Sequence, residues 1–220
     1  MNKSFLFLLS LAAPIMAGAQ LNHGGEPLQW ADSHFSLELP FITTPELDKQ
    51  LIAAQDAISD PIKDAPWRFG IEVPCEATPE NAGQWTFFPE ENLAVWHLGI
   101  ECPGATGVSL EFEKFRIPKG GKMYLWDASR TVYRGALTHL NNKDHGGMTV
   151  GLISSDRIVI EYQIAMDAED WGDLKLKSII HAYRGLQSKL NELQAEQDRG
   201  PFGNSGACNI NVNCPEGDAW

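Results

Sequence analysis

The chain contains 220 residues and carries a formal net charge of −12, with 29 acidic against 17 basic side chains. So acidic a surface repels phosphate backbones and anionic lipid headgroups, which argues against nucleic acids and membranes as partners. The length suits one domain of ordinary size with flanking arms. The acidity would also suit a basic partner, but solubility explains it more simply.

Residues 1–19 have the pattern of a secretory signal peptide. Lys3 gives a weakly positive start, residues 5–13 are an apolar core, and small residues precede the predicted cut between Ala19 and Gln20. The apolar core is too short for a membrane span, which needs about 20 residues. A retained anchor is the alternative, but no cysteine suitable for lipidation stands near the cut. We therefore expect an exported, extracellular product, secreted or periplasmic, that has no membrane attachment after cleavage.

Residues 20–64 are predicted to form an extended arm followed by one helix. Glycines and prolines with little periodicity run to about residue 43. Thr44 is the expected helix cap and Pro45 fits the first turn, while Asp60-Pro61 should end the helix. Four apolar residues recur at helical spacing and predict one buried face, namely Leu47, Leu51, Ala54 and Ile58.

Residues 65–183 change to a period of two, which is typical of β-strands. Glycine and proline interrupt these runs about every 8–12 residues, as in an antiparallel sandwich joined by turns. The last strand is predicted from Leu174 to Tyr183, with Ser178 and Ile180 among the residues that alternate with charged ones. The apolar sides of three clear runs are Trp96, Leu98 and Ile100; Val108, Leu110 and Phe112; and Ile158, Ile160, Tyr162 and Ile164. The sequence therefore predicts an all-β fold, an antiparallel β-sandwich with a short N-terminal helix and an extended C-terminal arm.

Residues 184–202 are interpreted as an exposed linker. Leu186, Leu190 and Leu193 stand at helical spacing, so a short helix is the alternative. The stretch is rich in Gln and Glu, however, and its helix caps are poor.

Four cysteines in an exported chain allow disulfide bonds, in three pairings. Cys75 and Cys102 flank one stretch of the middle region, and we favour a bond between them. A local bond between Cys208 and Cys214 is one alternative for the other two. Neither C-x-x-C nor H-x-x-x-H spacing occurs, so the sequence predicts no metal site and no cofactor.

The C-terminal run Gly203–Asp218 contains Cys208 and Cys214 in a short alternating stretch. This run resembles the first residues of the mature protease in the lysyl endopeptidase family, which are trypsin-like secreted serine proteases. The resemblance implies that residues 203–220 begin a protease domain and that both cysteines bond to partners far downstream.

Parts of the middle region resemble the N-terminal domains that precede such proteases in secreted bacterial precursors. The stretches concerned are residues 67–70 with 95–105, and residues 115–127 with 157–162. The resemblance implies a jelly-roll-like pro-region at residues 65–183, between the signal peptide and the catalytic domain.

The resemblance also implies a function. The complete protein would hydrolyse peptide bonds after lysine, or a related basic residue, with Ser, His and Asp residues that all lie beyond Trp220. This chain would then be a non-catalytic part of a protease precursor, whose pro-region assists folding and restrains the enzyme. Its partners would be its own downstream protease domain and, for the complete enzyme, protein substrates.

Activation of such a precursor needs a cut in the linker, where the backbone is expected to be accessible. Lys189 suits a lysine-cleaving enzyme that acts on itself, whereas the Arg199-Gly200 bond suits a trypsin-like partner. The resemblance places the mature start near Gly203, but Phe202 precedes it where the family would have lysine.

Several residues imitate functional motifs. Ser205 stands among glycines like a protease nucleophile, but Asn204 and Ala207 replace the Asp and Gly of that loop. His97 and His181 are expected to be structural or surface-exposed. A loose metal site near one turn would use His139, Asp144 and His145, although no calcium-loop motif is present there.

Two alternatives to this protease precursor stay open. The first is a secreted β-sandwich that binds a glycan or another surface ligand without enzyme activity. Trp85, Trp96 and Trp126 beside acidic residues could line a carbohydrate-binding cleft, or a hydrolytic one in which paired carboxylates act on glycosides. The simpler interpretation puts Trp96 in the core and the acidic residues on a solvated face. The second alternative is a different class of protease with the same pro-domain. The acidic residues of the cleft in the first alternative are Glu90, Glu91, Glu101, Glu111 and Glu113.

Overall fold

The computed structural model describes residues 22–28, 39–62 and 66–185, which form mostly β-strands and one short α-helix. In chain order the elements are β1 (Phe41–Thr43), α2 (Lys49–Ser59), β2 (Gly70–Ala77), β3 (Gln84–Phe88), β4 (Leu93–Glu101), β5 (Gly107–Arg116), β6 (Lys122–Asp127), β7 (Tyr133–Leu137), the 3-10 helix η1 (His139–Asn141), β8 (Met148–Ile153), β9 (Arg157–Ala165) and β10 (Asp173–Ala182). No helix of the described residues is long and apolar enough to cross a membrane.

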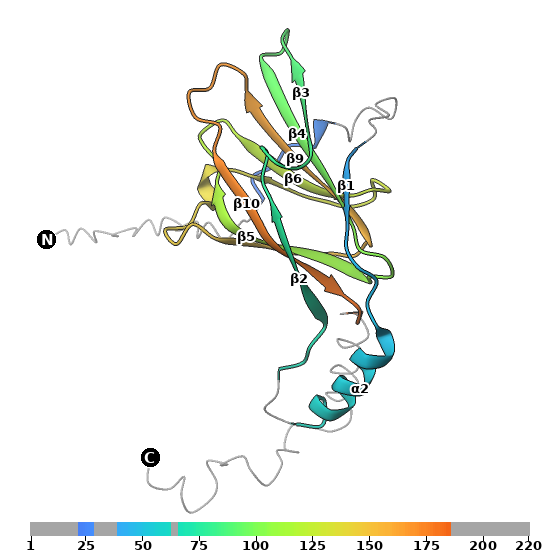
Figure 1. The fold of residues 1–220 in the computed structure, drawn as a ribbon. Coiled ribbons are helices and arrows are strands. Elements are labelled where there is room, and N and C mark those ends of the chain that lie inside the picture. The colour runs from blue at the N-terminus through green and yellow to red at the C-terminus, as the bar shows by residue number, and fades with distance from the viewer. Residues whose placement is uncertain (1–21, 29–38, 63–65, 186–220) are drawn as a thin grey trace, which may run out of the picture.

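The strands form two sheets that pack face to face (Figure 1). The six-stranded sheet has the order β1-β4-β9-β6-β7. The strands β1 and β3 pair with different parts of the same edge of β4. The four-stranded sheet has the order β2-β10-β5-β8. Paired strands are antiparallel except β1, which runs parallel to β4. The predicted β architecture of two mostly antiparallel sheets with one short helix is confirmed.

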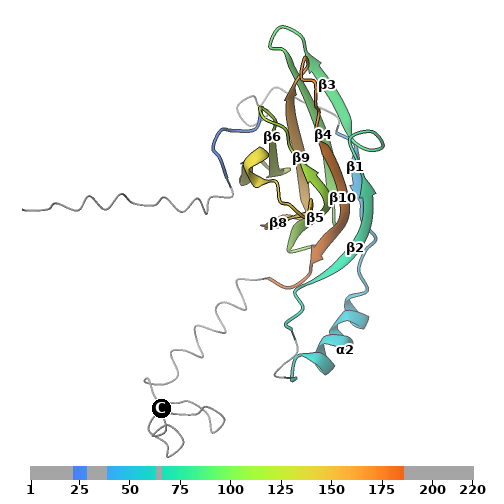
Figure 2. The ribbon, with the colours of Figure 1, turned by 90° about the vertical axis from the view of Figure 1, so that its left-hand side faces the viewer.

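Figure 2 shows the two layers from another side. Apolar side chains from the inner faces of both sheets fill the space between them. The alternation in the sequence predicted which residues these are, because successive side chains of a strand point to opposite faces. All ten apolar residues of the three predicted runs are buried there: Trp96, Leu98, Ile100, Val108, Leu110, Phe112, Ile158, Ile160, Tyr162 and Ile164.

The strand β10 departs from the predicted alternation. Its pairing with both neighbours shifts between Leu176 and Ser178, which marks a β-bulge. A bulge adds one residue to one strand and reverses the faces beyond it. Ile179 therefore enters the core and Ile180 is only half-buried, although the sequence pattern placed Ile180 with Leu174.

The N-terminal arm packs on the outer face of the six-stranded sheet. Backbone bonds join it to β7, from His23 N to Ala136 O at 2.8 Å and from Ala136 N to Gly24 O at 3.1 Å. Tyr133 also donates its hydroxyl to Gly25 O at 3.2 Å. A second apolar cluster lies on this outer face, made of Tyr124, Trp126, Ala136 and Val159 with Leu39, Phe41 and Tyr133 packed against it.

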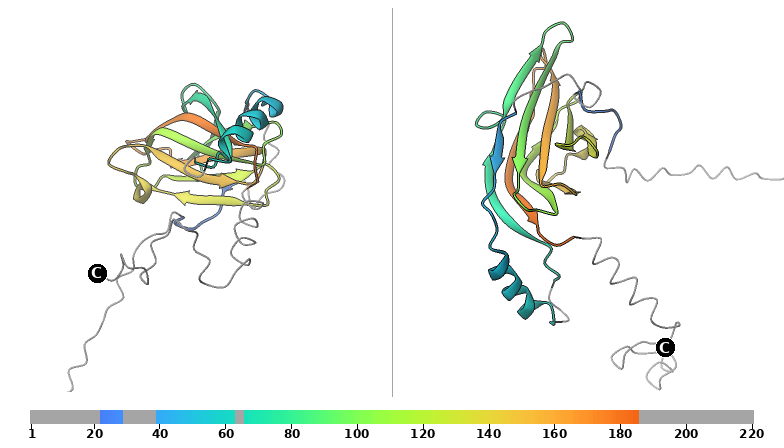
Figure 3. Two further views of the ribbon diagram at one scale, coloured as in Figure 1. Left: turned by 90° about the horizontal axis from the view of Figure 1, so that it is seen from below. Right: turned by 90° about the vertical axis from the view of Figure 1, so that its right-hand side faces the viewer.

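Helix α2 projects beyond one end of the strands (Figure 3). It begins later than predicted, because Asp48 rather than Thr44 is the cap and accepts bonds from the N–H groups of Gln50 and Leu51. Thr44 is instead buried and donates its N–H to Glu101 O at 2.8 Å, which continues the pairing of β1 with β4. The predicted end is confirmed, since Asp60 is the C-terminal cap.

The predicted buried face of α2 is wrong. Leu51, Ala54 and Ile58 are exposed, and the helix turns Ile52 and Asp56 toward the sandwich instead. The reason is the surface against which α2 packs. There the hydroxyl of Tyr183 and the guanidinium groups of Arg68 and Arg184 require an acidic side chain.

Candidate functional site

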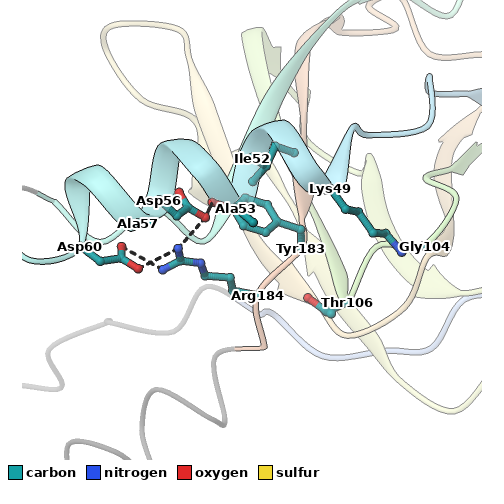
Figure 4. Close-up of a pocket in the computed structure, with 10 residues that line it drawn as sticks. All are labelled: Lys49, Ile52, Ala53, Asp56, Ala57, Asp60, Gly104, Thr106, Tyr183 and Arg184. Carbon is teal, nitrogen blue, oxygen red and sulfur yellow. Dashed lines mark hydrogen bonds and ion pairs between the residues drawn. The ribbon is translucent and has the colours of Figure 1, made fainter.

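A pocket of about 590 Å³ lies between helix α2 and the end of β10 (Figure 4). Its lining combines apolar residues with four charged side chains. One side of the pocket is the helix and the other is formed by the turn after β4 and the residues that follow β10. The lining residues are Lys49, Ile52, Ala53, Asp56, Ala57, Asp60, Gly104, Thr106, Tyr183 and Arg184.

Asp56 holds three side chains, of which Tyr183 and Arg184 line this pocket. Its carboxylate lies 2.7 Å from Arg68 Nη2, 2.5 Å from Arg184 Nη2 and 2.7 Å from the Tyr183 hydroxyl. Arg184 also forms a bidentate pair with Asp60, in which Nη1 lies 3.1 Å from Oδ1 and Nη2 lies 2.9 Å from Oδ2. Burial alone would raise the pKa of Asp56, but the hydrogen bonds from Tyr183, Arg68 and Arg184 outweigh it and lower that pKa.

This arrangement is suited to holding Tyr183 and Arg184 in place rather than to catalysis. The carboxylate is ionised and its oxygens are occupied by cationic and hydroxyl donors, so it is a poor proton acceptor. What the cluster does is fix Tyr183 and Arg184 against the helix, at the point where the chain leaves the sandwich. The predicted linker begins at that same point, at residue 184.

The two cysteines of the middle region are both thiols in this structure. Cys102 is fully buried in the core and Cys75 packs against the same core from β2. Burial, partly offset by a hydrogen bond with Thr44, raises the pKa of Cys102 to about 11. Burial raises the pKa of Cys75 as well, so neither is an activated nucleophile at neutral pH. The bond between them stays a prediction, and Cys208 and Cys214 lie outside the described residues.

A buried histidine and carboxylate face each other under the arm. His97 Nε2 lies 3.2 Å from Glu161 Oε2, and the two side chains are 1% and 0% exposed. Glu161 Oε1 also accepts bonds from Leu28 N at 2.6 Å and from Gln163 Nε2 at 2.7 Å. Burial would raise the pKa of Glu161, but His97, Gln163 and Leu28 together lower it. The pair ties the arm to the sheet and is closed to substrates, so His97 is structural and not surface-exposed.

His181 is structural in the same sense. It is 1% exposed, and its Nδ1 lies 3.5 Å from the Thr44 hydroxyl. Burial, and then the charge of Lys49, lower its pKa.

The loose metal site is not assembled in the described ranges. These residues contain no group of three or more His, Cys, Asp or Glu side chains that could hold a metal ion. His145 instead accepts the N–H of Gly147 through Nδ1 at 3.1 Å. Ser205 and the predicted processing residues lie outside the described part of the chain: Ala19, Gln20, Lys189, Arg199, Gly200 and Gly203.

The acidic residues and tryptophans of the predicted cleft are dispersed. Glu111 pairs with Lys177 at 2.9 Å, Glu113 with Lys175 at 2.8 Å and Glu101 with Arg157 at 3.4 Å, all on solvated surfaces. Trp96 lies in the core between the sheets, whereas Trp126 lies in the outer cluster. The simpler interpretation of Trp96 as a core residue is confirmed.

Sequence reasoning missed a surface group of aromatic side chains formed by Trp85, Phe87 and Trp171. The rings of Trp85 and Trp171 lie 5.1 Å apart, and Phe87 stacks on Trp85 at 6.4 Å. Phe87 is 53% and Trp171 36% exposed. Trp171 follows β9 in a turn far from β3 in the sequence, so no local spacing could have brought these residues together.

Comparison with known proteins adds no family to this fold. No model of a known protein family matches the chain, and no solved structure matches it. The class that the structure itself defines is a mostly β protein of two facing sheets, with one helix at the end of the sandwich.

Proposed function

We propose that this chain is the N-terminal, non-catalytic part of a secreted precursor of a trypsin-like serine endopeptidase similar to lysyl endopeptidases. Its two-sheet domain would be the pro-region, which assists folding of the protease domain and restrains it until the linker is cut. The complete enzyme would then hydrolyse peptide bonds after lysine or a related basic residue. The support is the resemblance of residues 203–220 to the start of such an enzyme.

One structural observation carries the proposal furthest. The last strand ends at Ala182, and Tyr183 and Arg184 are then clamped to α2 through Asp56 and Asp60. A fixed exit point keeps a downstream domain close to its pro-region, and a short tether gives effective concentrations in the millimolar range. Restraint in cis needs no tight intrinsic affinity under those conditions.

We further infer that the pro-region is a jelly roll. A jelly roll has eight strands in two sheets, arranged as two Greek keys. With β2, β4, β5, β6, β7, β8, β9 and β10 taken as its strands one to eight, the sheet orders read 1-8-3-6 and 2-7-4-5. This is the interleaving that two Greek keys produce, and β1 and β3 are then additions at the edge of strand β4. The connectivity agrees with the kind of domain that the sequence resemblance implies.

The first test is the sequence downstream of Trp220 in the gene. We expect an Ala-Ala-His-Cys run followed by Gly-Asp-Ser-Gly or Gly-Ser-Ser-Gly; a stop codon directly after Trp220 would overturn the proposal. The second test measures cleavage of a lysyl peptide by the uncut precursor, in which the pro-region is still tethered to the enzyme. Activity that D56N raises would support restraint through the clamped end of the domain, and E80Q, which changes an exposed acidic residue outside the pocket, serves as the matched control.

The aromatic group favours a second candidate function, binding of a glycan. Trp85 donates its indole N–H to Pro79 O at 3.2 Å and Trp171 donates to Ala168 O at 3.0 Å, so both rings are held in place by the backbone. Rigid aromatic faces at a surface pack against the apolar faces of sugar rings. A titration of tryptophan fluorescence with common polysaccharides tests this: W171A should abolish a response that L140A retains. The absence of any response in the unchanged protein would rule this function out.

A further inference from the structure

Helix α2 presents an apolar surface that the sandwich does not cover. Leu51 is 56% exposed, Ile58 75% and Ile62, just past the helix, 55%. Large apolar side chains that cluster on one side of a short helix mark an interaction surface more often than isolated ones do.

This surface is continuous with the pocket beside Tyr183. Ala53 and Ala57 line the pocket, and Ala54 lies next to them on the way to Ile58. All three alanines are exposed. Their short side chains would let a second helix approach α2 closely, since the distance between helix axes depends on the side chains at the contact.

The position of the chain exit indicates what covers this surface. Arg184 is bound to Asp56 and Asp60, so the chain leaves the described fold alongside the C-terminal half of α2. Thirty-five residues, 186–220, follow Gly185. The first of them carry Leu186, Leu190 and Leu193 at positions i, i+4 and i+7, which is the spacing of an apolar helical stripe.

We propose that residues 186–193 form a helix of two turns that docks on the apolar surface of α2. Leu186 would lie at the pocket, and Leu190 and Leu193 would lie toward Ile58. An isolated helix this short and with such poor caps is unstable in water. Packing of its apolar stripe against α2 would supply the stability that the helix lacks by itself. The acidic groups of α2 on this path, Asp56 and Asp60, are already paired with Arg184, so they do not repel the Glu192 side chain.

Docking would govern which bond of the linker is cut, and this consequence rests on the proposed function. A protease binds its substrate in an extended form, so a helical and packed Lys189 is protected. The Arg199-Gly200 bond lies beyond the docked stretch and stays accessible. Cutting would therefore occur at Arg199 before Lys189.

The experiment uses residues 20–220, the chain after signal removal, and a lysine-specific protease, with the cut sites identified by mass spectrometry. We expect I58S and, independently, L190S to raise the rate of cutting at Lys189 by about tenfold, the effect of losing one buried apolar contact. The double variant I58S/L190S should cut no faster than either single variant, because both remove the same contact.

Matched controls separate docking from general unfolding. L140S changes an equally exposed apolar residue, 63% exposed in η1, and should leave cutting at Lys189 unchanged. Cutting at Lys177 in β10 reports loss of the sandwich and should stay slow in every variant.

Equal rates at Lys189 in the unchanged chain, I58S and L190S would overturn the proposal. A concentration-dependent dimer that I58S dissociates and L190S does not would assign the surface to a second copy and overturn it as well. Neither outcome depends on the sequence beyond Trp220, so docking can fail while the proposed protease precursor stands, and the reverse.

Discussion

At the scale of single residues, Asp56 decides how α2 is joined to the sandwich. It is 4% exposed and receives bonds from Arg68, Tyr183 and Arg184, which come from both ends of the β region. A buried carboxylate with several donors is stabilising only as long as all partners are present, because each would otherwise lose hydration without compensation.

We expect D56N to lower the free energy of unfolding by about 2 kcal/mol, since two guanidinium groups lose their shared anion but retain some access to water. Urea unfolding followed by tryptophan fluorescence measures this change. D60N is the matched control, because Asp60 is 42% exposed and its pair with Arg184 is worth less than about 1 kcal/mol. Equal losses in the two variants would contradict the central place given to Asp56.

The same residue predicts a pH dependence. The pKa of Asp56 is lowered in the folded protein, so its contribution to stability is fully present above the unfolded carboxyl pKa of about 4. That contribution is lost as the pH falls through the lower folded value. The difference in unfolding free energy between the unchanged protein and D56N should therefore shrink progressively below about pH 4. A difference that stays constant down to pH 2 would show that Asp56 is not ionised in the fold.

At the scale of elements, the strands were predictable and their exceptions were not. Alternation along β4, β5 and β9 reports which face of a strand is buried, and the core residues follow from it directly. The bulge in β10 depends on how that strand pairs with β2 and β5, so its own residues do not reveal it. The buried face of α2 was predicted from apolar spacing, but the surface against which it packs is charged.

The candidate site was less accessible to sequence reasoning for the same reason. Asp56, Arg68 and Arg184 come from three separate segments, and only the fold brings them into contact. The group of Trp85 and Trp171 is likewise formed by distant parts of the chain. Alternation along its strand placed His97 on the less apolar side but left open whether it is structural or surface-exposed, because Glu161 and the arm that bury it come from other parts of the chain.

Attachment of β1 to the edge of β4 depends on a residue without a side chain. A Cβ atom at Gly99 would lie 2.6 Å from Cδ1 of Phe41, which packs over this position. We expect G99A to displace β1 and to cost about 1–3 kcal/mol, as overpacking does. Hydrogen exchange at the N–H of Thr44, which bonds to Glu101 O, should become faster as β1 loosens. G151A in β8 meets no atom within 4 Å and should leave both stability and exchange nearly unchanged.

At the scale of the whole molecule, the two sheets are held together by the apolar core and by the connections between strands. Cys75 belongs to β2 of the four-stranded sheet, and Cys102 directly follows β4 of the six-stranded sheet. Both contact the same core. A disulfide bond between them would therefore join the two layers covalently, in addition to closing the loop that contains β3 and β4.

We expect the exported protein to contain this bond, because oxidising compartments favour disulfides between thiols that the fold brings together. In a variant with Cys208 and Cys214 changed to serine, oxidation should raise the free energy of unfolding by about 3–4 kcal/mol, the effect of closing a loop of this length. Urea unfolding with and without a thiol reductant measures the difference, and a further change of Cys75 to serine should remove the response to reductant. Two alkylatable thiols per unfolded chain of the variant without Cys208 and Cys214, found without reductant in material taken from the exported fraction, would contradict the bond. The layers would then be held by the core alone, and the loop between β2 and β4 would owe its place to the pairing of β3 with β4.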